Sequence, residues 1–95
     1  MTDEIPDNQN FSNLTLQQYQ ELASATAIYP EELALPYLGL GLSGEAGEVA
    51  NKLKKDIRDE YLDKEGLAAE LGDVLWYIAM LCNELNISLN DVGNR

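Results

Sequence analysis

The chain of 95 residues contains no histidine and one cysteine, Cys82. The absence of histidine excludes zinc sites built on histidine and a histidine general base. A single cysteine cannot form an intramolecular disulfide, and the apolar run around Cys82 predicts a small core residue. Chemistry that depends on histidine or on paired cysteines is therefore excluded.

Basic residues are also scarce, since 6 Lys and Arg stand against 17 Asp and Glu, for a formal net charge of -11. Such a chain repels nucleic-acid phosphates unless cations intervene, so we expect no nucleic-acid partner. The sequence lacks any run of about 18 apolar residues that could cross a membrane. Its polar, acidic first ten residues are unlike a signal peptide. We therefore expect a cytoplasmic protein with no membrane partner.

Hydrophobic residues make up 45% of the chain, which indicates a folded domain rather than a disordered one. We expect a flexible N-terminal arm over residues 1–13 and one helical domain over residues 14–95. The core of so short a domain is modest. Apolar residues outside the main stripes, such as Trp76 and Met80, favour assembly into an oligomer.

Apolar residues recur at steps of three and four, which predicts helices and no strands. Thr15 and Gln18 form a capping-box pattern, and Ser88 is suited to cap a last short helix. The predicted helices run from near Thr15 to Tyr29, from about Pro36 to Asp59, from about Lys64 to Leu85, and from Leu89 onward. The predicted fold class is all-α, a helical bundle of about four helices.

The second predicted helix combines an apolar stripe with glycines. We expect the stripe to face the core; it consists of Leu35, Leu38, Leu42, Ala46, Val49, Leu53 and Ile57. Four glycines interrupt the first half of this helix, and each costs about 1 kcal/mol relative to alanine. We expect them either to kink the helix or to let another backbone approach closely.

The strongest local signal is an acidic segment that occurs twice in the sequence. Glu45-Ala46-Gly47-Glu48-Val49 resembles Glu70-Leu71-Gly72-Asp73-Val74, which lies 25 positions later. Because helix residues three apart lie on one side, the two acids of each copy form a short stripe at the edge of the apolar face. If the two helices pack antiparallel, both acidic stripes converge beside the seam.

Four carboxylates in one small volume repel one another strongly. At about 4 Å and an effective dielectric constant of about 20, each pair costs roughly 4 kcal/mol. Such a cluster persists only when a cation neutralises it or when some of the acids are protonated. Hard oxygen ligands suit Mg²⁺ or Mn²⁺, and Mg²⁺ favours phosphate-bearing ligands. The alternative is an ordinary solvated face on which Glu48 pairs with Lys52.

Basic and aromatic side chains near the acids are candidates for ligand contacts. Lys52 and Lys55 lie about one and two turns after Glu48, where an ammonium group can meet a triphosphate. Exposed lysines on a solvated helix face are the alternative. Trp76 points away from the acidic stripe, which favours a subunit interface, with stacking on a base as the alternative.

The two acidic segments, Gly44-Glu45-Ala46-Gly47-Glu48-Val49 and Glu70-Leu71-Gly72-Asp73-Val74-Leu75-Trp76-Tyr77, together resemble the MazG-like, all-α nucleoside triphosphate pyrophosphohydrolase superfamily. Its hallmark is Glu-Glu-x-x-Glu followed, after a gap, by Glu-x-x-Asp. The resemblance also covers residues 19–29 and the tail after Leu85. It implies a helical bundle assembled as dimers or dimers of dimers. It also implies Mg²⁺-dependent hydrolysis of an NTP or dNTP to the monophosphate and pyrophosphate, in dNTP pool control or house-cleaning.

The resemblance further implies roles for individual residues. The implied metal ligands are Glu45, Glu48, Glu70 and Asp73. Glu48 is also the acid implied to orient the attacking water. Tyr77 matches an aromatic position near the sugar, with a packed tyrosine as the alternative, and Asn94 matches an asparagine that helps to hold the phosphates.

Two positions depart from the family pattern. Gly44 stands where the pattern has its first glutamate, and the sequence ends at Arg95, where family members continue the last helix with a basic residue that helps to hold the phosphates. A second class of function therefore stays open. It is a non-catalytic helical oligomer that binds metal or nucleotide, or an interaction module that presents its acidic face to a basic partner.

Overall fold

The computed structural model describes residues 13–95, so the predicted arm lies, apart from Asn13, outside the described residues. Residues 13–95 are helical and contain no strand, as the sequence predicts. The elements are α1 (Leu16–Ala23), the 3₁₀ turns η2 (Ser24–Thr26) and η3 (Glu31–Leu33), α2 (Ala34–Asp59), α3 (Lys64–Glu84) and α4 (Leu89–Gly93). Within this range, every helix is too short or too polar to cross a lipid bilayer.

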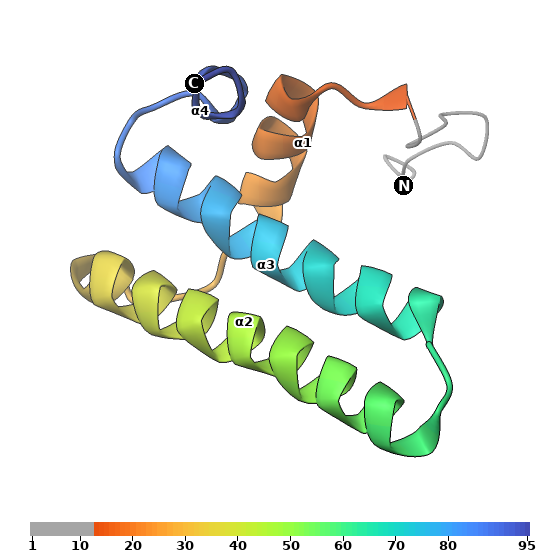
Figure 1. Cartoon of the computed structure of the whole chain (residues 1–95). Helices are drawn as coiled ribbons and strands as arrows, with labels where there is room; N and C mark the ends of the chain where they lie inside the picture. Colours follow the sequence, from red (N-terminus) through yellow and green to blue (C-terminus); the bar gives the residue numbers. More distant parts are fainter. Residues whose placement is uncertain (1–12) are drawn as a thin grey trace.

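The two long helices, α2 and α3, form an antiparallel hairpin (Figure 1). α3 lies in the middle of the molecule, with α2 on one side and with α1 and α4 on the other. The buried core surrounds the C-terminal half of α3, between α1 and α4 on one side and the start of α2 on the other; it consists of Ala23, Leu38, Ala79, Met80, Cys82 and Leu89. The hairpin extends beyond this core, toward the connection between α2 and α3.

The first helix is shorter than the sequence predicts. Its capping box is confirmed, because the Thr15 hydroxyl accepts from the Gln18 backbone N–H and the Gln18 side chain accepts from the Thr15 N–H. The predicted end at Tyr29 is wrong. Helix α1 stops at Ala23, where the hydroxyl groups of Ser24 and Thr26 donate to carbonyl oxygens of the last turn and draw the chain into a 3₁₀ turn.

The other helix boundaries agree closely with the predicted ones. α2 begins two residues before Pro36, which sits in the first turn, where its missing N–H is not needed. α2 then continues as one helix of 26 residues through all four of its glycines. Asn86, with φ of 59°, follows the end of α3, and the Ser88 side chain accepts from the Asp91 N–H to cap α4.

The core corrects one expectation about apolar residues. Met80, expected outside the main stripe, is fully buried, so its burial gives no support for an oligomer. Trp76 is half-buried, and its indole N–H donates to the Thr26 hydroxyl at 2.8 Å; its place in a subunit interface stays a prediction. Cys82 is buried, as predicted. The α2 stripe is only partly covered, because Leu53 and Ile57 are exposed.

A buried glutamine joins the short helices to α3. The Gln20 side-chain amide donates to the Asn83 side chain at 2.8 Å and to the Ile87 carbonyl at 3.0 Å. Its carbonyl oxygen accepts from the Leu89 N–H at 2.8 Å. These three bonds connect α1 to the end of α3 and to the start of α4, and they satisfy the buried polar groups of that junction.

We expect Gln20→Ala to destabilise the fold by about 2 kcal/mol, because it leaves the Leu89 N–H and the Ile87 carbonyl without their partner. Urea unfolding followed by circular dichroism measures this change. The control is Gln17→Ala, an exposed position one turn earlier, where we expect a change below about 0.5 kcal/mol. Equal effects of the two substitutions would contradict the role given to Gln20.

Candidate metal centre between the two long helices

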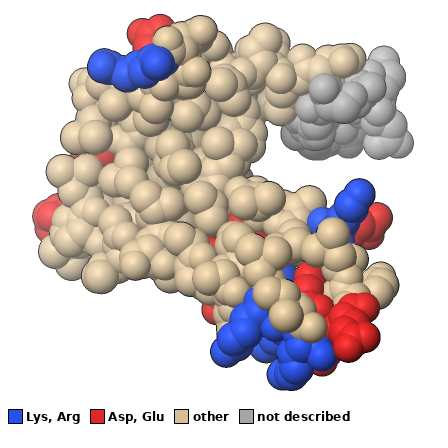
Figure 2. Space-filling view, viewed as in Figure 1, with Lys and Arg blue, Asp and Glu red and all other residues tan. Residues whose placement is uncertain are grey.

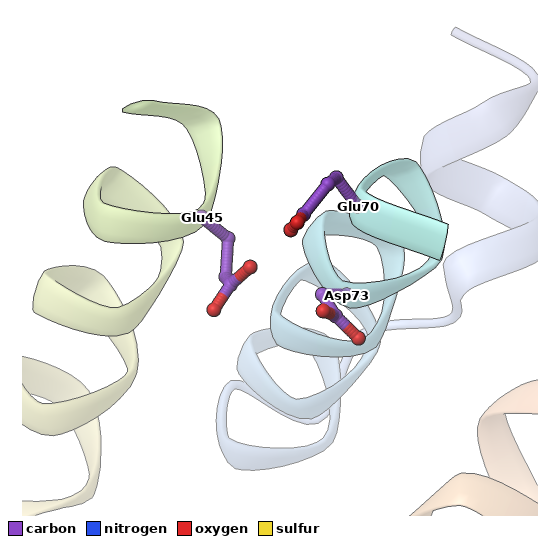
Figure 3. A group of neighbouring side chains, drawn as sticks. All are labelled: Glu45, Glu70 and Asp73. Carbon is purple, nitrogen blue, oxygen red and sulfur yellow. The ribbon is translucent and has the colours of Figure 1, made fainter. Parts of the chain in front are cut away.

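Three of the four predicted carboxylates meet across the seam of the hairpin. Glu45 projects from α2, and Glu70 and Asp73 project from α3 toward it (Figure 3). One carboxylate oxygen of each lies within 4.8 Å of the others. The antiparallel packing and the spacing of three residues between acids on α3 produce this convergence, as the sequence predicts.

Glu45 has the environment that most favours a cation. Its Oε1 atom is buried and has no hydrogen-bond partner among the described residues. Burial raises the pKa of Glu45 above its ordinary value, and the negative charges of Asp73 and Glu70 raise this pKa further. A buried carboxylate oxygen without a donor is unfavourable unless a proton or a metal ion binds it.

The donor set fits a hard divalent cation. Mg²⁺ binds oxygen ligands at about 2.1 Å, so ligand atoms around one ion lie roughly 3–4 Å apart, which the limit of 4.8 Å between these carboxylate oxygens allows. Carboxylate oxygens on two rigid helices are ligands typical of Mg²⁺ and Mn²⁺. Glu45, Glu70 and Asp73 would hold the ion, and the unpartnered Oε1 atom of Glu45 would gain a ligand bond.

Glu48 lies outside this group of three. It is exposed and stands one turn after Glu45 on α2. Its charge nevertheless contributes to the raised pKa of Glu45, so the two carboxylates are neighbours. The roles of Glu48 as a fourth ligand and as the acid that orients water stay predictions.

The basic residues gather at the end of the hairpin. Every Lys and Arg except Arg95 lies between residues 52 and 64, and Figure 2 shows charged groups of both signs around the connection between α2 and α3. Lys52 is engaged there, because its ammonium group contacts Asp56 at 3.2 Å and Asp63 at 2.9 Å. Lys55 is exposed. The alternative pairing of Glu48 with Lys52 is not what the structure contains.

The aromatic candidate Tyr77 packs against α2. Its ring lies on Gly41, and it makes an edge-to-face contact with Trp76, the two ring centroids being 5.0 Å apart. Burial raises the pKa of Tyr77, as do the nearby Tyr37 and the carboxylates of Glu45 and Asp73, which places this phenol beside the acidic group.

Asn94 lies in a different part of the molecule from the acids. It follows α4, which packs on α1 and α3 but not on α2 within residues 13–95 (Figure 1). Its side-chain amide donates to the Asn90 carbonyl at 2.8 Å. The chain by itself therefore does not bring Asn94 together with Glu45, and its contact with phosphate stays a prediction.

Several residues of the acidic group's surroundings and of the hairpin end were missed in the sequence analysis. Tyr19 of α1 lies near Asp73, since burial first and then the charge of Asp73 raise the pKa of Tyr19. Asp56 and Asp63, the partners of Lys52, were also missed. Asp63 precedes a segment with the apolar periodicity of a helix, which is a signal for a helix N-cap. This signal could have revealed Asp63. Nothing local in the sequence indicates the pairing of Asp56 with Asp63, because it depends on how the hairpin closes.

We expect the metal-free protein to lose stability as pH rises through the raised pKa of Glu45. A carboxyl whose folded-state pKa is raised favours folding fully only below its ordinary value of 4.5, and this contribution disappears above the raised value. Glu45→Gln removes this ionisation. In EDTA, the stability of Glu45→Gln relative to wild type should therefore increase as pH rises from about 4.5 through the raised pKa of Glu45.

Urea unfolding at several pH values measures this difference. Asp63→Asn provides a contrast, because the Gly66 N–H and Lys52 lower the pKa of Asp63. A lowered pKa contributes stability that is lost as pH falls, so the deficit of Asp63→Asn should shrink toward acid pH. A difference between Glu45→Gln and wild type that is the same at every pH would contradict the environment described for Glu45.

Comparisons with known proteins identify the family of the chain. The family model of the MazG nucleotide pyrophosphohydrolase domain matches residues 35–95, the range that holds all the candidate ligands. The Gene 37 protein of Mycobacterium phage L5 is 47% identical over 88 residues, a match that covers 81% of this chain and 77% of that protein. No solved structure gives a significant match. The chain therefore belongs to the MazG nucleotide pyrophosphohydrolase domain family.

Proposed function

We propose that this protein is a Mg²⁺-dependent nucleotide pyrophosphohydrolase that converts an NTP or dNTP to the monophosphate and pyrophosphate. Mn²⁺ is the expected substitute for Mg²⁺. One observation carries the proposal. The two acidic segments that define the family resemblance converge, and one buried oxygen atom of Glu45 lacks a hydrogen-bond partner within residues 13–95.

In this proposal three of the four acids bind the cation and the fourth accepts a proton. Glu45, Glu70 and Asp73 hold the cation between α2 and α3. When bound, Mg²⁺ neutralises phosphate charge and lowers the pKa of a coordinated water. Glu48, one turn along α2 and open to solvent, orients the attacking water and takes its proton as the oxygen attacks, most simply at the α-phosphorus. The bond to the pyrophosphate leaving group then breaks.

Residues next to the acids hold the substrate. Lys55 is exposed two turns after Glu48 on α2 and is able to meet the negative charge of the triphosphate. Tyr77 lies beside the acidic group, where its ring can border the sugar. Asn94, on the other side of α3, can complete such a site only from a second copy of the chain or after a rearrangement.

A substrate panel tests the activity. We expect the protein, with Mg²⁺, to release pyrophosphate from at least one of the common NTPs and dNTPs. Glu70→Gln should lower kcat by about 100-fold or more, because it removes charge that holds the cation at the transition state. Glu65→Gln, which changes an exposed acid in the first turn of the same helix, is the matched control.

The same experiment separates the two classes of function. Folded protein that releases no pyrophosphate from any nucleotide, with Mg²⁺ or Mn²⁺, would contradict the enzymatic proposal. Calorimetric binding of nucleotide without turnover would then identify a non-catalytic binding protein. Unchanged melting in Mg²⁺ would point instead to an interaction module.

We also propose that the chain forms a dimer, or a dimer of dimers, through the hairpin. Leu53 is 42% exposed and Ile57 78% exposed, although both belong to the apolar stripe of α2. They line a hollow of about 270 Å³ together with Asp56, Glu60, Tyr61 and Leu62. A core confined to the other end of the hairpin leaves this apolar surface for a second copy to cover.

Light scattering tests the assembly. Wild type should have at least the mass of a dimer, and Ile57→Asp should shift the protein toward monomer by introducing a charge into the covered surface. Ile28→Asp is the control, since Ile28 is 91% exposed and lies outside the hairpin. A monomeric wild type would refute the assembly.

A further inference from the structure

Three contacts between α2 and α3 share one register. Gly41 lies against Tyr77, Glu45 lies against Asp73, and Lys52 lies against Gly66. The step from Gly41 to Lys52 is 11 positions forward on α2, and the step from Tyr77 to Gly66 is 11 positions back on α3. The carboxylates therefore stand between two other contacts in a single antiparallel alignment of the helices.

The two outer contacts each place a side chain on a glycine of the opposite helix. A Cβ atom on Gly41 would come within 2.8 Å of three atoms of the Tyr77 ring. A Cβ atom on Gly66 would come within 2.7 Å of Cε of Lys52 and within 2.5 Å of a carboxylate oxygen of Asp63. The remaining glycines of the two helices have open space at this position: Gly39, Gly44, Gly47 and Gly72. The two contacts therefore require glycine at positions 41 and 66, whereas a Cβ atom at the other four glycines would meet nothing.

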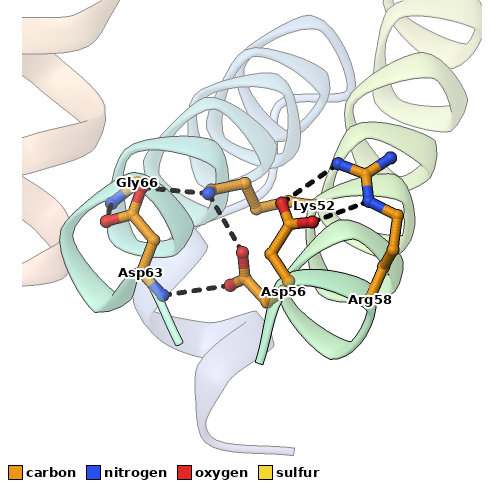
Figure 4. A network of polar contacts seen from close by, with 6 residues as sticks. Lys52, Asp56, Arg58, Asp63 and Gly66 are labelled. Carbon is orange, nitrogen blue, oxygen red and sulfur yellow. Dashed lines mark hydrogen bonds and ion pairs between the residues drawn. The ribbon is translucent and has the colours of Figure 1, made fainter. Parts of the chain in front are cut away.

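A polar network fixes the contact at the hairpin end (Figure 4). The Lys52 ammonium group bridges Asp56 of its own helix and Asp63, the N-cap of α3. The Asp63 N–H donates to the Asp56 side chain at 3.1 Å, and the Asp63 side chain accepts from the Gly66 N–H at 3.0 Å. These bonds connect the last turns of α2 directly to the first turn of α3.

We propose that Lys52 on Gly66 and Tyr77 on Gly41 are positioning contacts that set the α2–α3 register and thereby hold Glu45 opposite Glu70 and Asp73. The inference rests on the proposed metal site and assigns Lys52 to the alignment of the helices instead of to the triphosphate. A slip of one residue moves a helix by about 1.5 Å and turns it by about 100°, which removes a carboxylate from the group. Productive sites tolerate errors of no more than about 0.5 Å.

Mn²⁺ binding to the full-length protein tests the inference without turnover. The dissociation constant is measured from the electron paramagnetic resonance signal of free Mn²⁺, well below the melting temperature. We expect Lys52→Met to weaken Mn²⁺ binding by about tenfold, the size of effect found for residues that orient metal ligands. Lys54→Met, an exposed lysine on the same helix, should leave the dissociation constant within about twofold.

Gly41, at the other end of the acidic group, is tested by a matched pair of substitutions. Gly41→Ala places a methyl group on the Tyr77 ring, and Gly39→Ala makes the same change in open space on the same helix. We expect Gly41→Ala to weaken Mn²⁺ binding by about tenfold and Gly39→Ala to leave it unchanged. Where Lys52→Met folds poorly, Asp63→Asn weakens the ion pair while it keeps the oxygen atom that caps α3.

The outcomes separate this inference from the proposed function. If wild type binds no Mn²⁺, the metal site fails and the inference fails with it. If wild type binds Mn²⁺ and the variants melt lower but bind it equally well, their role is structural only and the inference is wrong. A Lys52→Met variant with normal Mn²⁺ binding and a raised KM would identify Lys52 as a substrate contact and would also overturn it.

Discussion

The close approach of like charges across the hairpin is the constraint on which the rest of the structure depends. Carboxylate oxygens of Glu45, Glu70 and Asp73 lie within 4.8 Å of one another. Repulsion among these charges opposes folding when all three carboxylates are ionised. The buried Oε1 atom of Glu45 adds an unsatisfied acceptor. A bound cation relieves both penalties, so the stability of the fold and its proposed chemistry have the same requirement.

Helix starts were predicted well where a side-chain cap sets them. The capping box at Thr15 and the cap at Ser88 depend on neighbours in sequence, and both are present. Burial was predicted less well. Met80 is fully buried because α1 and α4 cover a face of α3 that lies outside its main stripe. Ile57 is exposed although it continues the α2 stripe, because nothing within residues 13–95 covers it. Both facts depend on tertiary arrangement.

The candidate site also has one part that local sequence predicts and one part that depends on tertiary arrangement. The acids were found from the sequence because a spacing of three residues and a repeated pattern place them on one side of two helices. The environment of Lys52 was not found, since its partner Asp63 comes after the turn of the hairpin. The importance of Gly41 and Gly66 was also hidden, because each glycine is defined by a side chain from the opposite helix. Sequence spacing predicts which face of a helix a residue occupies. Only the register of the two packed helices determines which residue it contacts there.

Anomalous diffraction from crystals grown with Mn²⁺ tests the central claim most directly. The account predicts an anomalous peak between α2 and α3, with the carboxylates of Glu45, Glu70 and Asp73 as ligands at about 2.1–2.2 Å. The buried oxygen of Glu45 should be one of the ligand atoms. A structure with saturating Mn²⁺ that has no peak at this position, or has the ion bound elsewhere while these carboxylates stay apart from it, would contradict the account.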